Sequence, residues 1–369
     1  MKIGNCRFGN RQAWEIDNGK LRLTMLKGGG HIASVVLNGE PRINPLWRPV
    51  WKAVEPWEYK ARHDKRYGGK LLAAIAGHNL CLGWFGEPSD EEAAAGVGCH
   101  GEAPIVRWKL LGKKVSKSSV SLTCGCELPV AQMSFKRTLS SRKGSNIVHV
   151  KEQVRNRAKR DIPFTMCQHV TVGPPFLEKG VTLFDMPATK GHTQQATFGG
   201  RERLKFDTEF KWPVGPGMKG EKVDMRMMSK KYRVSGDFST QLMDPSRTDA
   251  WFSAVNPKQG LMLAYVWKRA DFPWIGNWEQ NYGRKESPWD GKSLTRGMEF
   301  TNTPFPVSLR EAVDMGEFQG EKTFRWLTAR EKYEVEYDII LEPVPSECKG
   351  VADILRKSKG RGFVVNLIA

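Results

Sequence analysis

Short runs that alternate apolar and polar residues recur along the chain, with turn residues between them. In such a run successive side chains point to opposite faces of a strand, so one face packs on a core and the other meets solvent or a second sheet. Along 333–341, for example, Tyr333, Val335 and Tyr337 share one face. Similar runs lie at 21–25, 31–37, 119–123, 146–150 and 261–267. The pattern predicts an all-β chain.

Helical signals are few. Segment 89–95 predicts a short helix, because Ser89 can cap it together with Glu92 three residues later. Segment 351–358 predicts a second short helix near the end of the chain.

The order of these elements predicts one domain. The sequence has no βαβ rhythm, no internal repeat and no long linker. We therefore expect a single domain over 1–369, a large antiparallel β-sandwich with its core at about 20–345 and a short C-terminal helical tail. Long loops are expected at 41–70 and 187–232.

Two glycine-containing segments add local predictions about turns. Asn38-Gly39 follows the run at 31–37 and predicts a tight hairpin. The triplet 28–30 leads into a strand rather than a helix, so it does not indicate a phosphate-binding loop.

Composition and charge narrow the class of protein. Hydrophobic residues make up 40% of the chain and the net charge is +18. A basic surface attracts anions, yet no helix-turn-helix, zinc finger or aromatic-basic RNA motif organises it, so nucleic-acid binding ranks last among the hypotheses. No run approaches the length of a membrane span, and residues 1–10 lack a signal-peptide core, so a cytoplasmic location is expected.

The seven cysteines are odd in number and irregularly spaced, which predicts reduced thiols rather than a disulfide framework. Cys124-Gly-Cys126 does not have the spacing of a zinc knuckle.

Polar chemistry gathers in segments 76–88, 98–104, 164–176, 274–280 and 296–304. In order, these segments and the Gly29–Gly39 strand and turn resemble the aldose 1-epimerase (galactose mutarotase) superfamily over about 20–345. The resemblance is carried by His100-Gly101 with Trp108 downstream, by His169 after a strand, and by the late acidic residue Glu299. It implies the galactose mutarotase-like supersandwich.

The resemblance also implies a reaction. Anomers interconvert when a base removes the C1 hydroxyl proton while an acid protonates the ring oxygen, and the ring opens and recloses. It assigns Glu299 as the base and His169 as the acid, with His100 near the ring oxygen. No cofactor is implied. The partner is a small sugar, and the basic charge extends the candidates to acidic or phosphorylated sugars.

Further residues are expected to bind the sugar. Aromatic side chains suit its C–H face and polar ones its hydroxyl groups. The expected substrate-binding residues are His78, Asn79, Glu102, Arg66, Trp84 and Trp278, with Trp274 as an alternative platform. Asp244 and Asp249 are candidates by position for the family's substrate-orienting aspartate.

Each assignment has a structural alternative, since a strand histidine often lies in a core and a strand glutamate often joins a salt bridge. His100 and Glu102, placed on one strand face, could also join His78 and His169 in a cupin-like metal cluster. Other hypotheses are a sugar-binding protein without catalysis and a lyase or hydrolase acting on acidic polysaccharide. The oligomeric state stays open.

Overall fold

The computed structural model describes residues 1–39, 41–197, 201–358 and 362–369. Within these residues most of the chain lies in two large antiparallel sheets, the first of 14 strands. Its spatial order is β1 (Lys2–Phe8), β2 (Arg11–Asp17), β3 (Leu21–Leu26), β4 (Ile32–Leu37), β5 (His78–Gly83), β10 (Ile162–Val172), β20 (Leu294–Thr301), β19 (Trp274–Asn281), β16 (Ser235–Met243), β12 (Ala188–Thr193), β13 (Glu209–Lys211), β14 (Val214–Pro216) and β15 (Lys222–Asp224), with β23 (Arg325–Leu327) paired to β10.

The second sheet has 8 strands in the described part of the chain. Its spatial order is β11 (Leu183–Asp185), β17 (Asp249–Asn256), β18 (Leu261–Lys268), β24 (Lys332–Pro343), β9 (Ile147–Asn156), β8 (Met133–Arg142), β7 (Ser119–Leu128) and β6 (Lys109–Val115). Two separate hairpins complete the strands: β21 (Glu317–Phe318) with β22 (Glu321–Lys322), and β25 (Gly350–Arg356) with β26 (Phe363–Ile368).

The helices are short and lie in the connections. They are η1 (Ala61–His63), α1 (Asp64–Tyr67), α2 (Lys70–Ala74), α3 (Asp90–Ala94), η2 (Ala103–Ile105), η3 (Pro257–Gln259) and α4 (Leu309–Met315). The helix expected at 89–95 is confirmed as α3, where Ser89 accepts a hydrogen bond from the Glu92 backbone and Glu92 caps Ser89 in return. Among the described residues, no helix has both the length and the apolar character that a membrane span requires.

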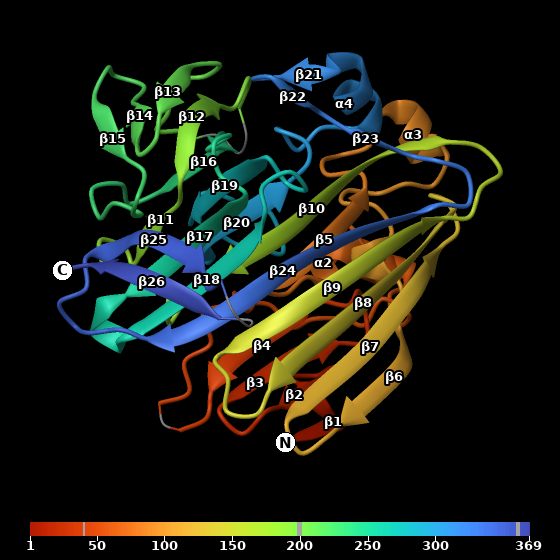
Figure 1. The fold of residues 1–369 in the computed structure, drawn as a ribbon. Helices are drawn as coiled ribbons and strands as arrows, with labels where there is room; N and C mark the ends of the chain where they lie inside the picture. The colour runs from red at the N-terminus through yellow and green to blue at the C-terminus, as the bar shows by residue number, and fades with distance from the viewer. Residues whose placement is uncertain (40, 198–200, 359–361) are drawn as a thin grey trace.

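The two sheets pack face to face, as the predicted sandwich requires. In Figure 1 the arrows of β24, β9, β8 and β7 run side by side in front of the N-terminal strands of the first sheet. Between the layers, Phe300 of β20 stacks on Trp267 of β18 with ring centroids 4.4 Å apart. Alternate residues of β8 are buried, which is the pattern of a strand with one face on the core.

The central strands of the first sheet differ from β8 because both of their faces are buried. Every residue of β19 and β20 is buried, and so is nearly every residue of β10. One face of these strands packs on the second sheet, and connecting segments cover much of the other. Polar residues on the covered face are therefore withdrawn from bulk water.

Both ends of the chain differ from the prediction. The segment 351–358, expected as a helical tail, forms strand β25 and pairs with β26. The sandwich also begins before residue 20, because β1 and β2 extend the first sheet.

Two predicted connections differ as well. After Asn38-Gly39 no hairpin strand follows in the described residues, since β4 pairs back with β3 and meets β5 at one position, Ile32 opposite His78. The expected loop at 187–232 contains the short strands β12 to β15. The loop at 41–70 holds only η1, α1 and the start of α2.

Candidate active site

A cleft of about 780 Å³ opens on the outer face of the first sheet. Its floor carries His169 of β10, Glu299 of β20 and Trp278 of β19. His169 stands directly opposite Glu299 across the two strands. Because opposite residues of an antiparallel pair project to the same side, the register itself brings these two side chains together.

Glu299 and His169 touch at the base of the cleft. Glu299 Oε1 lies 3.1 Å from His169 Nε2, and the two residues are 2% and 5% exposed. The contact is short but poorly aligned, because within the described residues Oε1 accepts no hydrogen bond. A buried carboxyl oxygen without a hydrogen bond is costly. This oxygen therefore has unused hydrogen-bonding capacity beside His169 Nε2, although the atom itself is buried.

Two glycines make room for the Glu299 carboxyl group. A Cβ atom on Gly297 would lie 2.2 Å from Glu299 Oε1, and one on Gly276, opposite Glu299 on β19, would lie 3.3 Å from Oε2. Any larger side chain at Gly297 would displace the carboxyl group from its place against His169.

His100 approaches the same point from a turn. Its backbone has a φ of +64° and that of Gly101 +73°, so the pair forms a tight left-handed turn rather than the strand that was expected. His100 Nδ1 lies 2.5 Å from the Phe85 carbonyl oxygen, which can only accept, so Nδ1 carries the proton. The His100 and His169 rings are 5.1 Å apart, edge to face.

The buried pair on the floor favours neutral forms. Burial raises the pKa of Glu299 well above its ordinary value, Cys81 adds to the rise, and His100 opposes it. Burial also lowers the pKa of His169 well below its ordinary value, and the neighbouring His100 lowers it further. At neutral pH these shifts favour a protonated Glu299 and an unprotonated His169, so Glu299 would act as the acid and His169 as the base, the reverse of the roles that the resemblance implied.

Two thiols, Cys81 below the cleft surface and Cys99 in its lining, shift the pKa of His100. Burial acts to lower the pKa of His100, but Cys81 and Cys99 outweigh it and raise the pKa well above the usual value. Burial acts to raise the pKa of Cys81, whereas Cys167 and His100 bring it down to about 6. Cys81 and Cys167 face one another across β5 and β10. No local sequence pattern indicates a role for Cys81 and Cys167, since the two strands are far apart along the chain.

The walls of the cleft are aromatic, and its rim carries charge. Besides Trp278, the wall includes Phe85, Phe238 and Trp289. The remaining ionisable side chains that line it are Lys70, Glu87, Cys99 and Arg284. Sequence reasoning missed these residues except Trp278. Most of them lie in turns and loops, where no periodic pattern indicates which way a side chain points; Phe238 lies on β16 and Lys70 at the start of α2.

His78 and Asn79 lie on opposite faces of β5, and neither lines the cleft. His78 is fully buried between the sheets, where Nε2 lies 2.9 Å from Gln168 Oε1 and Nδ1 lies 3.3 Å from the Tyr265 hydroxyl. The substrate-binding assignment of His78 is therefore wrong in this structure. Asn79 stands opposite His169 on the cleft side but lies below the surface, with its Nδ2 3.7 Å from Cys81 Sγ.

Glu102 and Arg66 also stay outside the cleft and hold loops in place. Glu102 begins η2 and accepts hydrogen bonds from the backbone N–H groups of residues 130 and 131. Arg66 donates to both oxygens of Asp290 and to the Ser287 hydroxyl. Both side chains are thus occupied, and neither reaches the floor.

Two of the predicted aromatic platforms are core residues. Trp84 packs in the main hydrophobic core, and Trp274 is fully buried on β19 without lining the cleft. Trp278 is the predicted platform that the structure places at the site.

The two candidate aspartates lie elsewhere. Asp244 binds Ser246 in an exposed turn, and Asp249 pairs with Arg356 on the second sheet.

The four residues of the alternative metal cluster do not converge, because His78 faces the interior and Glu102 is bound to backbone. Across the described residues, no group of three or more His, Cys, Asp or Glu side chains is placed to hold a metal ion.

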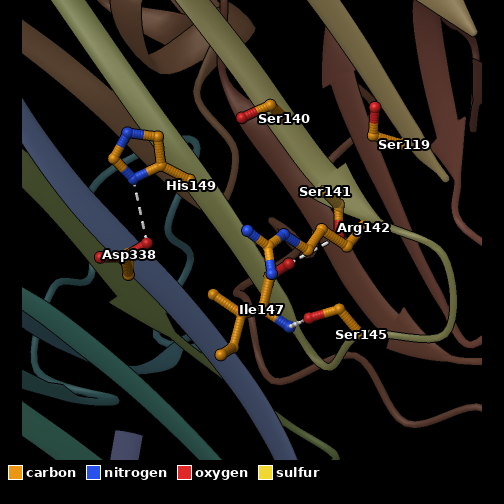
Figure 2. Close-up of a pocket in the computed structure, with 8 residues that line it drawn as sticks. All are labelled: Ser119, Ser140, Ser141, Arg142, Ser145, Ile147, His149 and Asp338. Carbon is orange, nitrogen blue, oxygen red and sulfur yellow. Dashed lines mark hydrogen bonds and ion pairs between the residues drawn. The ribbon is translucent and has the colours of Figure 1, made fainter. Parts of the chain in front are cut away.

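A second hollow, of about 240 Å³, lies on the outer face of the second sheet (Figure 2). Its register places Ser140, His149 and Asp338 in a row across β8, β9 and β24. His149 Nδ1 lies 3.0 Å from Asp338 Oδ1, but Nε2 lies 3.6 Å from Glu336 and no described hydrogen bond joins it to Ser140. The row therefore lacks the nucleophile–base contact of a hydrolase, and the larger cleft is the better candidate.

Solved structures of one fold match this chain over most of its length. A "putative aldose 1-epimerase" from Klebsiella pneumoniae gives a TM-score of 0.64 at 15% identity, covering 93% of this chain and 84% of that one. A galactose mutarotase-like protein from Clostridium acetobutylicum gives 0.61 at 11% identity, covering 93% and 99%. A galactose mutarotase related enzyme from Lactobacillus acidophilus gives 0.56 at 11% identity, covering 90% and 98%.

At these identities the likeness concerns the fold. The chain has the galactose mutarotase-like supersandwich, which the resemblance predicted. No protein-family model matches the sequence, and no curated protein matches it.

Proposed function

We propose that the protein interconverts the anomers of an aldose by acid–base ring opening in the cleft of the first sheet. The observation that carries the proposal is the contact of Glu299 Oε1 with His169 Nε2 on the cleft floor, with the His100 ring beside it. A carboxyl group and an imidazole at one point can supply both proton transfers, each contributing about 10²–10⁴-fold.

The proton count supports this chemistry. In ring opening, one group takes the proton of the C1 hydroxyl while the other gives a proton to the ring oxygen. Rotation about the C1–C2 bond and reclosure reverse both transfers on the other face of the carbonyl carbon. The pair therefore returns to its starting protonation state without a cofactor. This balance needs one acid and one base, which the opposite pKa shifts of Glu299 and His169 provide.

The aromatic wall supports a sugar as the ligand. Trp278 lies against His169 with ring centroids 5.9 Å apart, so a ring held over the reacting pair would meet an indole face or edge. Aromatic surfaces suit the C–H faces of sugars, whereas polar side chains take the hydroxyl groups.

NMR of freshly dissolved α-sugars tests the proposal. The wild type should speed the approach to anomeric equilibrium, and Glu299→Gln and His169→Asn should each lower that rate by about 10²-fold or more. Glu209→Gln on β13 and His192→Gln on β12 are matched controls, because both residues lie outside the cleft lining and should leave the rate unchanged.

Two outcomes would refute the proposal in different ways. No acceleration across neutral and acidic monosaccharides would remove mutarotation from consideration. Sugar binding by calorimetry in the absence of anomer exchange would select a non-catalytic binding protein instead.

A further inference from the structure

Two cations line the part of the cleft beyond the reacting pair. Arg284 follows β19 in the connection to β20, and Lys70 begins α2. Apart from Glu299 on the floor, Glu87 is the only carboxylate among the described lining residues. Because burial keeps Glu299 neutral, the ionised lining beyond the floor has an excess of positive charge.

Arg284 lies one aromatic ring away from the chemistry. Its guanidinium carbon is 5.7 Å from the ring centroid of Trp278 and 5.1 Å from that of Trp289. Trp278 in turn contacts His169 with centroids 5.9 Å apart. Trp278 therefore lies between His169 and the guanidinium group. A substituent on a sugar held at His169 would reach Arg284 by extending past the Trp278 ring.

Hydrogen bonds and an ion pair of Arg66 with Asp290 and Ser287, here called the clasp, join the two segments that carry Arg284 and Lys70. Arg66 of α1 binds Asp290 Oδ2 at 2.9 Å, and its Nη1 and carbonyl oxygen each bond the Ser287 hydroxyl at 2.8 Å. The segment 284–290 is thereby tied to the turn just before Lys70. Holding these two segments together lowers the entropy that the rim loses when a ligand binds.

The chemistry of Arg284 favours an anion as its ligand. Burial lowers the pKa of Arg284, while the charges of Glu286, Cys99 and Glu87 oppose that shift. A guanidinium that has lost hydration gains from a charge-assisted hydrogen bond, and its planar fork matches the oxygens of a phosphate or carboxylate.

We propose that the sugar acted on at Glu299 and His169 carries an anionic substituent, a phosphate or a carboxylate, that Arg284 binds with help from Lys70. The inference rests on the proposed function and names its substrate class. The net charge of +18 is consistent with it, since a positive field raises the encounter rate with anions.

The test compares D-glucose, D-glucose 6-phosphate and D-glucuronate by anomer exchange, each with wild type, Arg284→Gln, Arg284→Lys and Lys70→Gln. Wild type should prefer at least one of the anionic sugars, and which one distinguishes phosphate from carboxylate. The ratio of anionic to neutral kcat/KM should fall roughly tenfold to hundredfold in Arg284→Gln, the loss typical of a hydrogen bond between charged groups. Arg284→Lys should retain part of the preference, and Lys70→Gln should lose less of it.

Arg142→Gln is the matched control, because Arg142 lies at the second hollow and not in the cleft. In wild type, rising salt should lower kcat/KM for the anionic sugar more than for glucose. This measurement keeps the inference testable if an Arg284 variant fails to fold.

Different results would refute the anion-binding inference and the proposed function. Equal kcat/KM for neutral and anionic sugars, with no change of ratio in Arg284→Gln, overturns the inference and leaves mutarotation intact. In the opposite case, wild type shows no anomer exchange, but calorimetry shows that Glu299→Gln binds an anionic sugar and that this binding is lost when Arg284 is also replaced. That result upholds the anion site and excludes mutarotation.

Discussion

Gly101 sets the turn that presents His100 to the cleft. Its φ is +73°, and a Cβ atom added there would lie 2.4 Å from the Leu82 carbonyl oxygen. The residue pairs with Leu82 in an isolated bridge, so the turn is pressed directly against β5. The position of the His100 imidazole thus depends on the absence of a side chain on the next residue.

Gly101→Ala should therefore destabilise the fold by roughly 2–4 kcal/mol and slow anomer exchange. Gly96→Ala is the matched control, because Gly96 also has a positive φ, +92°, but nothing lies within 4 Å of an added Cβ atom. It should cost only the backbone strain, about 1–2 kcal/mol. Urea unfolding of both variants measures the difference, and equal losses would contradict the close approach to Leu82.

At the residue scale the sequence indicated His169, Glu299, His100 and Trp278, and the structure brings these four to one cleft. Alternation along a strand shows which residues share a face, but not which strands become neighbours. The pairing of His169 with Glu299 depends on a register between segments about 130 positions apart, which no local pattern specifies.

The errors in placing the other predicted residues have a common cause. Glu102 precedes η2 and Arg66 lies in the four-residue helix α1, both within connections between strands, where the direction of a side chain follows from tertiary contacts. Arg284 and Lys70 were missed for the same reason. His78 was misplaced because its neighbour Asn79, not His78 itself, faces the cleft side of β5.

Among the elements, the C-terminal hairpin explains the clearest error of prediction. The buried residues Val351 and Ile354 are three positions apart, which is helical spacing. A bulge in β25 between Val351 and Asp353 produces this spacing in a strand. Val351 and Ile354 pack on Trp251 and Val266 of the second sheet.

Ile354→Ala should lower the free energy of unfolding by about 2–4 kcal/mol, because it empties a site that is 1% exposed. Leu355→Ala is the neighbouring control, since Leu355 is 45% exposed and its loss should cost less than about 0.5 kcal/mol. Chemical denaturation of the two variants checks the expectation. Similar losses at both positions would mean that the hairpin does not present alternate faces.

At the scale of the whole molecule, buried ionisable groups set the response of stability to pH. Burial lowers the pKa of His31 to about 3, and it lowers the pKa values of His78 and His169 well below 6.5. Between pH 5 and 6 the unfolded chain binds protons at these positions that the folded chain does not bind. Stability therefore falls as the pH falls through this window.

Glu299 has the opposite effect on the pH dependence of stability. Because its pKa is raised in the folded protein, the folded chain keeps a proton on Glu299 above about pH 4.5, where the unfolded chain has released it. His31→Asn should reduce the slope of unfolding free energy against pH by about 1.4 kcal/mol per pH unit, and Glu299→Gln should increase it by a similar amount. Urea unfolding at pH 5.0, 5.5 and 6.0 measures both slopes. Changes of the same sign in the two variants would contradict the assigned protonation states.

The floor of the cleft is made of paired strands, whereas its rim is made of turns and loops that the clasp of Arg66 with Asp290 and Ser287 ties together. These two parts can change independently during evolution or protein engineering. Under the proposed function, exchange of the segments at 61–74 and 282–293 is expected to alter the choice of substrate while the sheet still holds Glu299 and His169 in place. We therefore expect ligand specificity to be adjustable through the rim without any change to the paired strands of the floor.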